Sequence, residues 1–119
     1  MTAADVSRQG APSGWDEGQE FLTSTGDSML TVTPPEHARR ARLDLTNFRP
    51  VPLGVTIKAY GDTIFDGEIE SGRTVVDIDV RAGVSMDIRV TGELWCPDVE
   101  IHNGDGRKIG IHLRAIGFV

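Results

Sequence analysis

The chain has 119 residues, of which 39% are hydrophobic and 25% are charged, and its formal net charge is −6. These values fit one globular domain of ordinary composition, and the negative charge argues against nucleic acid and anionic membrane surfaces as partners. The single cysteine, Cys96, cannot form an internal disulfide. The start "MTAADVSRQG" lacks the apolar core of a signal peptide, and no apolar run is long enough to span a membrane, so the cytoplasm is the expected default location.

The first 14 residues are small and polar and include Gly and Pro. This composition predicts a flexible N-terminal arm, which becomes ordered only where something holds it. Residues 15–119 form the predicted folded domain. A neighbouring subunit is one candidate for what would hold such an arm.

From Trp15 onward, apolar and polar residues alternate with a period of two rather than with the period of a helix. The clearest segments are 41–46, 53–59, 76–80, 84–90 and 109–114. Gly-containing turns such as "YGDT", "ESGRT" and "NGDG" separate such segments. The pattern predicts an all-β fold, an antiparallel β-sandwich of about eight strands that resembles a jelly roll.

Carboxylates and histidines are candidates for a catalytic or metal-binding role. Asp66, Glu68 and Glu70 share a strand face, but no apolar neighbour is present to raise the pKa of any of these carboxyl groups. We therefore expect a solvated face rather than a catalytic pair, and a protein that is not an enzyme. The three histidines lack the spacing of metal ligands, so no metal and no cofactor are expected. A weak calcium alternative remains at Asn103 and Asp105, because that loop is acidic and rich in glycine.

The segment "LWCPDVEIHNGDGRKIGIHL", residues 94–113, carries a distinctive pattern. An aromatic residue and a proline are followed by a glycine-containing loop and then by Asp-x-Arg-x-Ile-Gly-Ile, which leads into the last strand. This pattern resembles β-sandwich accessory modules of bacterial surface-polysaccharide systems, which accompany glycosyltransferases or occur alone. The resemblance extends in order over residues 14–117. It implies a jelly-roll domain with a non-catalytic role in polysaccharide assembly or carbohydrate binding.

The residues of this pattern have an expected structural role, with ligand contact as the alternative. Asp105 can accept hydrogen bonds from backbone N–H groups of its own turn. Arg107 can tie loop carbonyls or a carboxylate such as Asp98 or Glu100 to the sheet, and Gly110 leaves room for close packing over the last strand. The predicted fold signature consists of Trp95, Pro97, Asp105, Arg107 and Gly110.

The leading functional prediction is a non-catalytic carbohydrate-binding or polysaccharide-assembly accessory module. Its partner would be a saccharide or a polysaccharide-assembly protein. In such a module Trp15 or Tyr60 would stack on the sugar, while Asp62, His102 and Asn103 would form hydrogen bonds from loops at the sandwich ends. The alternative is a structural protein, of the kind that decorates virions or surface layers, which forms homo-oligomers through its sheet edges and N-terminal arm.

Overall fold

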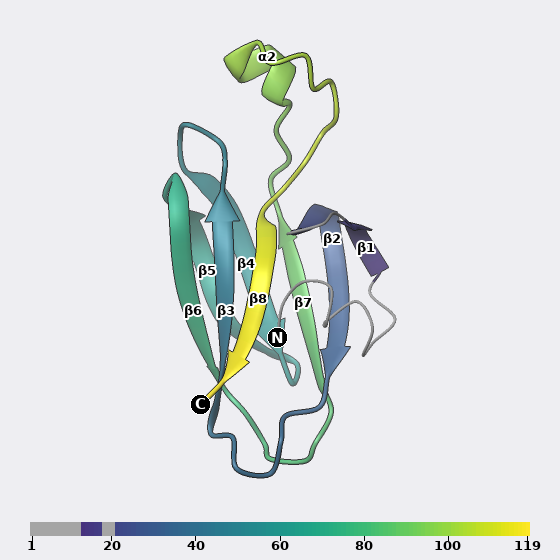
Figure 1. The fold of residues 1–119 in the computed structure, drawn as a ribbon, viewed down its shortest axis with the longest axis vertical. Helices are drawn as coiled ribbons and strands as arrows, with labels where there is room; N and C mark the ends of the chain where they lie inside the picture. The colour runs from purple at the N-terminus through teal and green to yellow at the C-terminus, as the bar shows by residue number, and fades with distance from the viewer. Residues whose placement is uncertain (1–12, 18–20) are drawn as a thin grey trace.

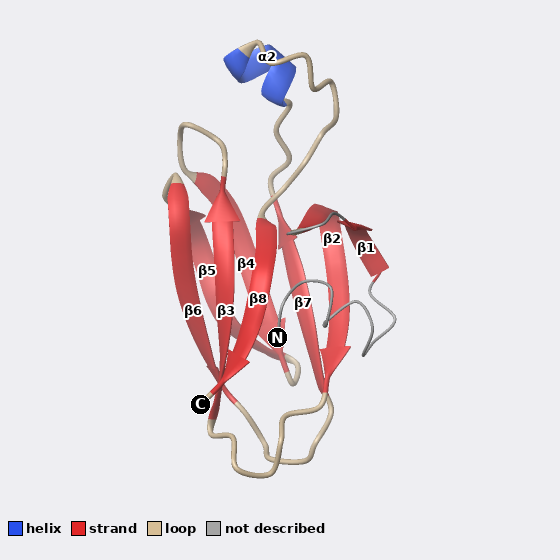
Figure 2. Cartoon of the chain, in the orientation of Figure 1, coloured by secondary structure: helices blue, strands red, loops and turns tan. Residues whose placement is uncertain are grey.

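A computed structural model describes residues 13–17 and 21–119, and within them nearly all regular structure is antiparallel strand (Figures 1 and 2). The strands are β1 (Ser13–Glu17), β2 (Leu22–Val32), β3 (Arg40–Asn47), β4 (Leu53–Ala59), β5 (Asp62–Ile69), β6 (Gly72–Asp79), β7 (Met86–Gly92) and β8 (His112–Phe118). One short helix, α2 (Pro97–Ile101), lies between β7 and β8. No helix of the described residues has the length and apolarity needed to cross a bilayer.

The strands follow one hydrogen-bonded path in the order β5-β4-β7-β2-β8-β3-β6, with β1 paired to β2. Figure 1 shows β6, β3 and β8 in a layer in front of the other strands. The two layers join where β2 pairs with β8, over only Leu22–Leu113 and Thr23–His112. The sheet therefore folds over on itself into a nearly barrel-shaped sandwich, and the predicted all-β sandwich is confirmed.

Alternating burial explains why these segments form the two layers. In β3 the buried residues include Ala41, Leu43 and Leu45, while Arg40 and Arg42 at alternate positions are exposed. The strands β4 and β7 repeat this pattern, and their inward side chains meet those of β3 in one hydrophobic core. A period of two places alternate residues on one face of a strand, so each strand buries one face and hydrates the other.

The edge strand β5 departs from this pattern. Ile69 is its one fully buried residue, and Asp66 and Glu68 are exposed. Among the described strands, β5 pairs only with β4, at one end of the hydrogen-bonded path. These two carboxylates therefore lie on a solvated face, as the sequence predicted.

Residues 1–12 of the predicted arm lie outside the described residues. Ser13 and Gly14, which complete that range, belong to β1. The carbonyl oxygen of Gly14 accepts hydrogen bonds from the hydroxyls of Thr25 (2.7 Å) and Ser28 (2.6 Å), which hold β1 against β2. Oligomerisation through the arm and the sheet edges remains a prediction.

Candidate ligand-binding cavity

The connection between β7 and β8 extends well beyond the ends of the strands and carries α2 at its tip (Figure 1). At its base, Trp95 and Ile109 form an antiparallel bridge, with N–H to O distances of 2.8 and 2.9 Å in the two directions. Beyond the bridge, Pro97 occupies the first turn of α2, where its missing N–H costs no hydrogen bond. His102 ends the helix in a left-handed conformation, with φ of 53°.

Gly110 anchors the returning arm of this connection to the sheet. Its N–H donates to the carbonyl oxygen of Ser24 on β2 at 2.8 Å. A Cβ added to Gly110 would lie 3.2 Å from both Cβ and the carbonyl oxygen of Ser24, which is tighter than ordinary packing. The absence of a side chain at Gly110 therefore allows the close approach of two backbones.

Asp105 and Arg107 form a local ion pair at the tip of the connection. The Asp105 carboxylate accepts from Nε and Nη2 of Arg107, both at 2.9 Å, and from the Arg107 backbone N–H at 3.1 Å. These bonds lower the pKa of Asp105 to about 2. The carboxylate partner of Arg107 is thus Asp105 rather than Asp98 or Glu100, the two examples suggested by the sequence: Asp98 accepts from the Gly104 N–H, and Glu100 accepts from Arg49.

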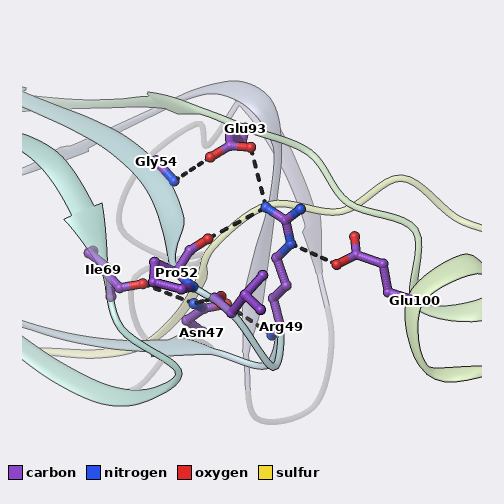
Figure 3. A network of polar contacts seen from close by, with 8 residues as sticks. Asn47, Arg49, Pro52, Gly54, Ile69, Glu93 and Glu100 are labelled. Atoms are coloured by element: carbon purple, nitrogen blue, oxygen red, sulfur yellow. Dashed lines mark hydrogen bonds and ion pairs between the residues drawn. The ribbon is translucent and has the colours of Figure 1, made fainter.

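Arg49, on the connection between β3 and β4, holds α2 in place (Figure 3). Its Nε donates to Glu100 of α2 at 2.8 Å, and its Nη1 donates to Glu93, just after β7, at 3.2 Å. Glu93 in turn accepts from the Gly54 N–H at 2.8 Å. The Gly54 N–H and Arg49 both lower the pKa of Glu93. One guanidinium group therefore links the β3–β4 connection to two points of the β7–β8 connection.

A cavity of about 320 Å³ lies between this projecting connection, the β3–β4 connection and the start of β8. Its lining is partly apolar and partly polar: Phe48, Trp95, Pro97, Ile101, Asn103, Asp105, Arg107, Ile109 and His112. An apolar wall with a few convergent polar groups is the usual composition of a small-molecule site.

His112 forms the aromatic part of the cavity wall together with Phe48. Its imidazole packs edge-to-face against Phe48 and Phe21, with ring centroids 4.7 and 5.6 Å away. The side chain is only 7% exposed. Burial lowers the pKa of His112 to about 4, and the nearby charge of Arg107 acts in the same direction. At neutral pH the ring is therefore uncharged.

Several polar groups of the lining residues are not used by the fold. Nε1 of Trp95 and Nδ1 of His112 are buried and have no hydrogen-bond partner among the described residues. Asn103 accepts from the Asp105 N–H through Oδ1 at 2.9 Å, which leaves its Nδ2 donors unused within the described part of the chain. Arg107 similarly uses Nε and Nη2 for Asp105 and leaves Nη1 without a described partner. The Asn103 and Arg107 donors are exposed and can therefore meet a ligand in the cavity, whereas the two buried ring nitrogens have almost no accessible surface.

The five residues proposed from the sequence as ligand contacts do not come together. Tyr60 and Asp62 lie at the β4–β5 turn, at the opposite end of the sandwich from α2 (Figure 1). Trp15 is half-buried on β1, packs against the core and does not line the cavity. His102 is exposed at the end of α2 and is not a lining residue. Asn103 alone of the five lines the cavity.

Sequence reasoning missed two lining residues and gave others a structural role. Phe48 and His112 were not among the proposed contacts, although both line the cavity. His112 occupies a polar position in the alternation of the last strand and was expected to be hydrated, whereas Phe21 and Phe48 cover it. Trp95 and Pro97 are buried, and the backbone bridge of Trp95 is structural, so the fold signature and the cavity lining share residues. A signal was available in Phe48, an aromatic residue placed directly after β3 at the start of a connection.

In the acidic loop around Asn103 and Asp105, the side-chain oxygens already accept hydrogen bonds within the protein. Asn103 Oδ1 accepts from a backbone N–H, and the Asp105 carboxylate is paired with Arg107. Within residues 13–17 and 21–119, no group of three or more His, Cys, Asp or Glu side chains is arranged to hold a metal ion. The weak calcium alternative and the expectation of no metal both remain predictions.

Comparison with known proteins identifies the fold but not a family. The sequence matches no family model and no curated protein. Among solved structures, similar chains are an acetyl xylan esterase from the rumen bacterium Butyrivibrio proteoclasticus (TM-score 0.62, 14% identity) and an exo-β-1,3-galactanase from Phanerochaete chrysosporium in complex with β-1,3-galactotriose (0.57, 13%). A third is a family two carbohydrate esterase from Clostridium thermocellum in complex with cellohexaose (0.55, 7%).

The matched part is a fraction of each of these proteins. The first two alignments cover 100% of this chain and 32% and 28% of the solved chains, and the third covers 88% of this chain and 29% of the other. The chain therefore spans about a third of the length of the proteins it matches. At these identities the similarity establishes a shared β-sandwich fold.

Proposed function

We propose that this domain binds a saccharide without catalysing a reaction, in the cavity beside α2, and acts as an accessory module in carbohydrate or surface-polysaccharide chemistry. One observation carries the proposal. The cavity combines an apolar wall with exposed side-chain donors of Asn103 and Arg107 that the described part of the fold leaves unpaired. A sugar ring requires this combination, because its C–H face is apolar and its edge carries hydroxyl groups.

The apolar part of the wall is accessible to a ligand. Phe48 is 49% exposed and Ile101 is 44% exposed, although both are large hydrophobic side chains that line the cavity. An exposed aromatic ring offers a flat surface for the C–H face of a pyranose. Phe48 thus takes the stacking role that the sequence had suggested for Trp15 or Tyr60.

The titratable groups of the cavity support a non-catalytic role. Asp105 is the one carboxylate among the described lining residues, and Arg107 lowers its pKa to about 2, so it is a poor general acid near neutral pH. His112 is the other titratable candidate, and its pKa of about 4 makes it a weak base. Glycoside hydrolysis generally uses two carboxyl groups facing each other across the bond that is cleaved.

The fold comparison adds circumstantial support. The solved chains that share this sandwich are described as carbohydrate esterases and a galactanase, and two of them hold oligosaccharides. Function does not follow from fold, so the cavity rather than the similarity carries the proposal.

A glycan array, followed by calorimetric titration of the best glycan, tests the proposal. Wild-type protein should bind at least one glycan, and Phe48→Ala should weaken the affinity about tenfold or more because it removes the stacking surface. Val84→Ala is the matched control, since Val84 is also 49% exposed but lies on the β6–β7 connection at the other end of the sandwich. Circular dichroism should show that both variants are folded. Absence of binding to every glycan, or equal loss in both variants, would contradict the proposal.

A further inference from the structure

On the basis of the proposed function, we further propose that the cavity takes a single neutral sugar ring at the end of a saccharide chain. Two neighbouring hydroxyl groups of that ring would be recognised by Asp105 and Arg107, with Asn103 supplying a further donor. This inference specifies the ligand class for the site, and it depends on size, hydrogen-bonding capacity and charge.

Size comes first. The cavity volume of about 320 Å³ lies at the lower end of the range of roughly 300–1,000 Å³ that is typical of small-molecule pockets. Its walls come from the α2 connection, the β3–β4 connection and the start of β8. A volume of this size suits one ring, whereas a run of several rings needs an extended groove. The bound unit is therefore a chain end.

The hydrogen-bonding groups match a pair of hydroxyls. Arg107 Nη1 is an unused donor within the described part of the chain, and the Asp105 carboxylate beside it retains acceptor capacity after its three bonds. One sugar hydroxyl would accept a hydrogen bond from Arg107 Nη1, and a neighbouring hydroxyl would donate one to the Asp105 carboxylate. Because the two side chains are held 2.9 Å apart, the hydroxyls that they contact sit on neighbouring carbons. Asn103 Nδ2 adds a second donor on the same wall.

Charge favours a neutral sugar. The positive charge of Arg107 is already paired with Asp105, and His112 is uncharged at neutral pH. The chain as a whole carries a net charge of −6. A uronic acid would therefore bring its carboxylate to a site that has no unpaired cation among the described lining residues, inside a negative overall field.

The cavity wall is held in position before a ligand arrives. The bridge between Trp95 and Ile109 fixes the base of the projecting connection, and the ion pair between Arg49 and Glu100 holds α2 against the β3–β4 connection (Figure 3). A preorganised wall lowers the entropic cost of binding. Arg49 is a positioning residue in this arrangement, because it does not itself line the cavity.

The first experiment is calorimetric titration of the full chain with methyl glycosides of glucose, galactose and mannose and with the corresponding uronic acids. The preferred sugar is then tested as a series from one to four rings. We expect millimolar affinity for one neutral methyl glycoside, at least tenfold weaker binding of its uronic acid, and affinities that agree within about threefold along the series. A gain of tenfold or more with added rings, a preference for the uronic acid, or no binding of any methyl glycoside would overturn the inference.

The second experiment tests the residues. Asn103→Ala should weaken binding of the preferred methyl glycoside about fivefold to tenfold through loss of one donor. Arg107→Lys, which keeps the charge but loses the planar fork, should weaken it at least as much. Asp62→Asn, at the far end of the sandwich, is the control and should leave the affinity unchanged. Unchanged affinity in folded Asn103→Ala and Arg107→Lys would overturn the assignment.

These outcomes separate the inference from the function on which it rests. If the array detects a glycan but the single-ring and residue tests fail, the domain binds sugar in another way. If the array detects nothing, the proposed function itself fails.

Discussion

The two ends of the sandwich are built from similar residues but differ in how these residues are used. The α2 end carries the long β7–β8 connection and the cavity. The opposite end carries the β4–β5 turn, where Tyr60 and Gly61 have φ of 52° and 79°, as a tight hairpin turn requires. Both ends contain aromatic rings, carboxylates and arginines.

At the turn end, polar groups satisfy one another. The hydroxyl of Tyr60 accepts from the Arg81 N–H at 2.9 Å and donates to the Val84 carbonyl at 3.4 Å. The Arg81 guanidinium lies over the Tyr60 ring, 4.5 Å from its centroid, so this face of the ring is occupied. At the α2 end, Asn103 and Arg107 retain unused donors beside a cavity. Polar and aromatic residues at a loop tip therefore identify a binding site only when the fold leaves them unpaired.

The largest expected effect on stability comes from added side-chain atoms in the packing at the two ends of the sandwich. A Cβ added to Gly92, at the α2 end of β7, would overlap the Gly54 carbonyl oxygen and lie 3.2 Å from Val55 Cα, whereas one added to Gly117 of β8 would meet nothing within 4 Å. Gly92→Ala should lower the free energy of unfolding by about 3 kcal/mol. Gly117→Ala should change it by less than about 1 kcal/mol. Urea denaturation measures both, and equal effects would show that the α2 end is not the more tightly packed of the two.

The next largest effect is a pH dependence of the free energy of unfolding, which comes from His112 at the α2 end. Because burial lowers the pKa of His112 to about 4, the unfolded chain binds a proton below pH ~6.5 that the folded chain does not bind until pH ~4. The stability contributed by the neutral ring is therefore complete above pH 6.5 and is lost as the pH falls towards 4. Over this interval the free energy of unfolding of the wild type should fall by roughly 2 kcal/mol more than that of His112→Leu.

Denaturant unfolding at pH 7, 6, 5 and 4 measures this difference. His102→Asn is the control, because His102 is exposed at the end of α2 and asparagine tolerates its left-handed conformation. Parallel pH profiles for wild type and His112→Leu would show that the cavity wall is hydrated rather than buried.

The smallest effect is expected at the turn end. Tyr60→Phe removes the hydroxyl that accepts from the Arg81 N–H and donates to the Val84 carbonyl. Thermal unfolding should show a loss of about 0.5–1 kcal/mol, because these bonds lie at the surface. Saccharide affinity should stay as in wild type. A lowered affinity would place a ligand contact at this end and erase the functional difference between the two ends.

Much of the fold was predictable because strand alternation is a local property. The period of two in residues 41–46 and 53–59 indicated which side chains face the core, and Leu43, Leu45, Val55 and Ile57 are buried accordingly. The glycine turns marked where strands reverse. The pattern from Trp95 to Gly110 was predicted to be structural, and this stays a prediction; within it, Trp95 bridges Ile109 and Gly110 lies close to Ser24.

The candidate site depended on contacts between distant segments. Alternation predicted a hydrated position for His112, but Phe48, 64 positions earlier, covers its ring because β3 and β8 are neighbours in the sheet. Arg49 contacts Glu100 for a similar reason, as the β3–β4 connection and α2 lie at the same end of the sandwich. The sequence by itself determined which residues face inward, since that depends on near neighbours. Only the tertiary structure decided which of the remaining side chains meet around a cavity, because strand order and the folding of the sheet bring them together.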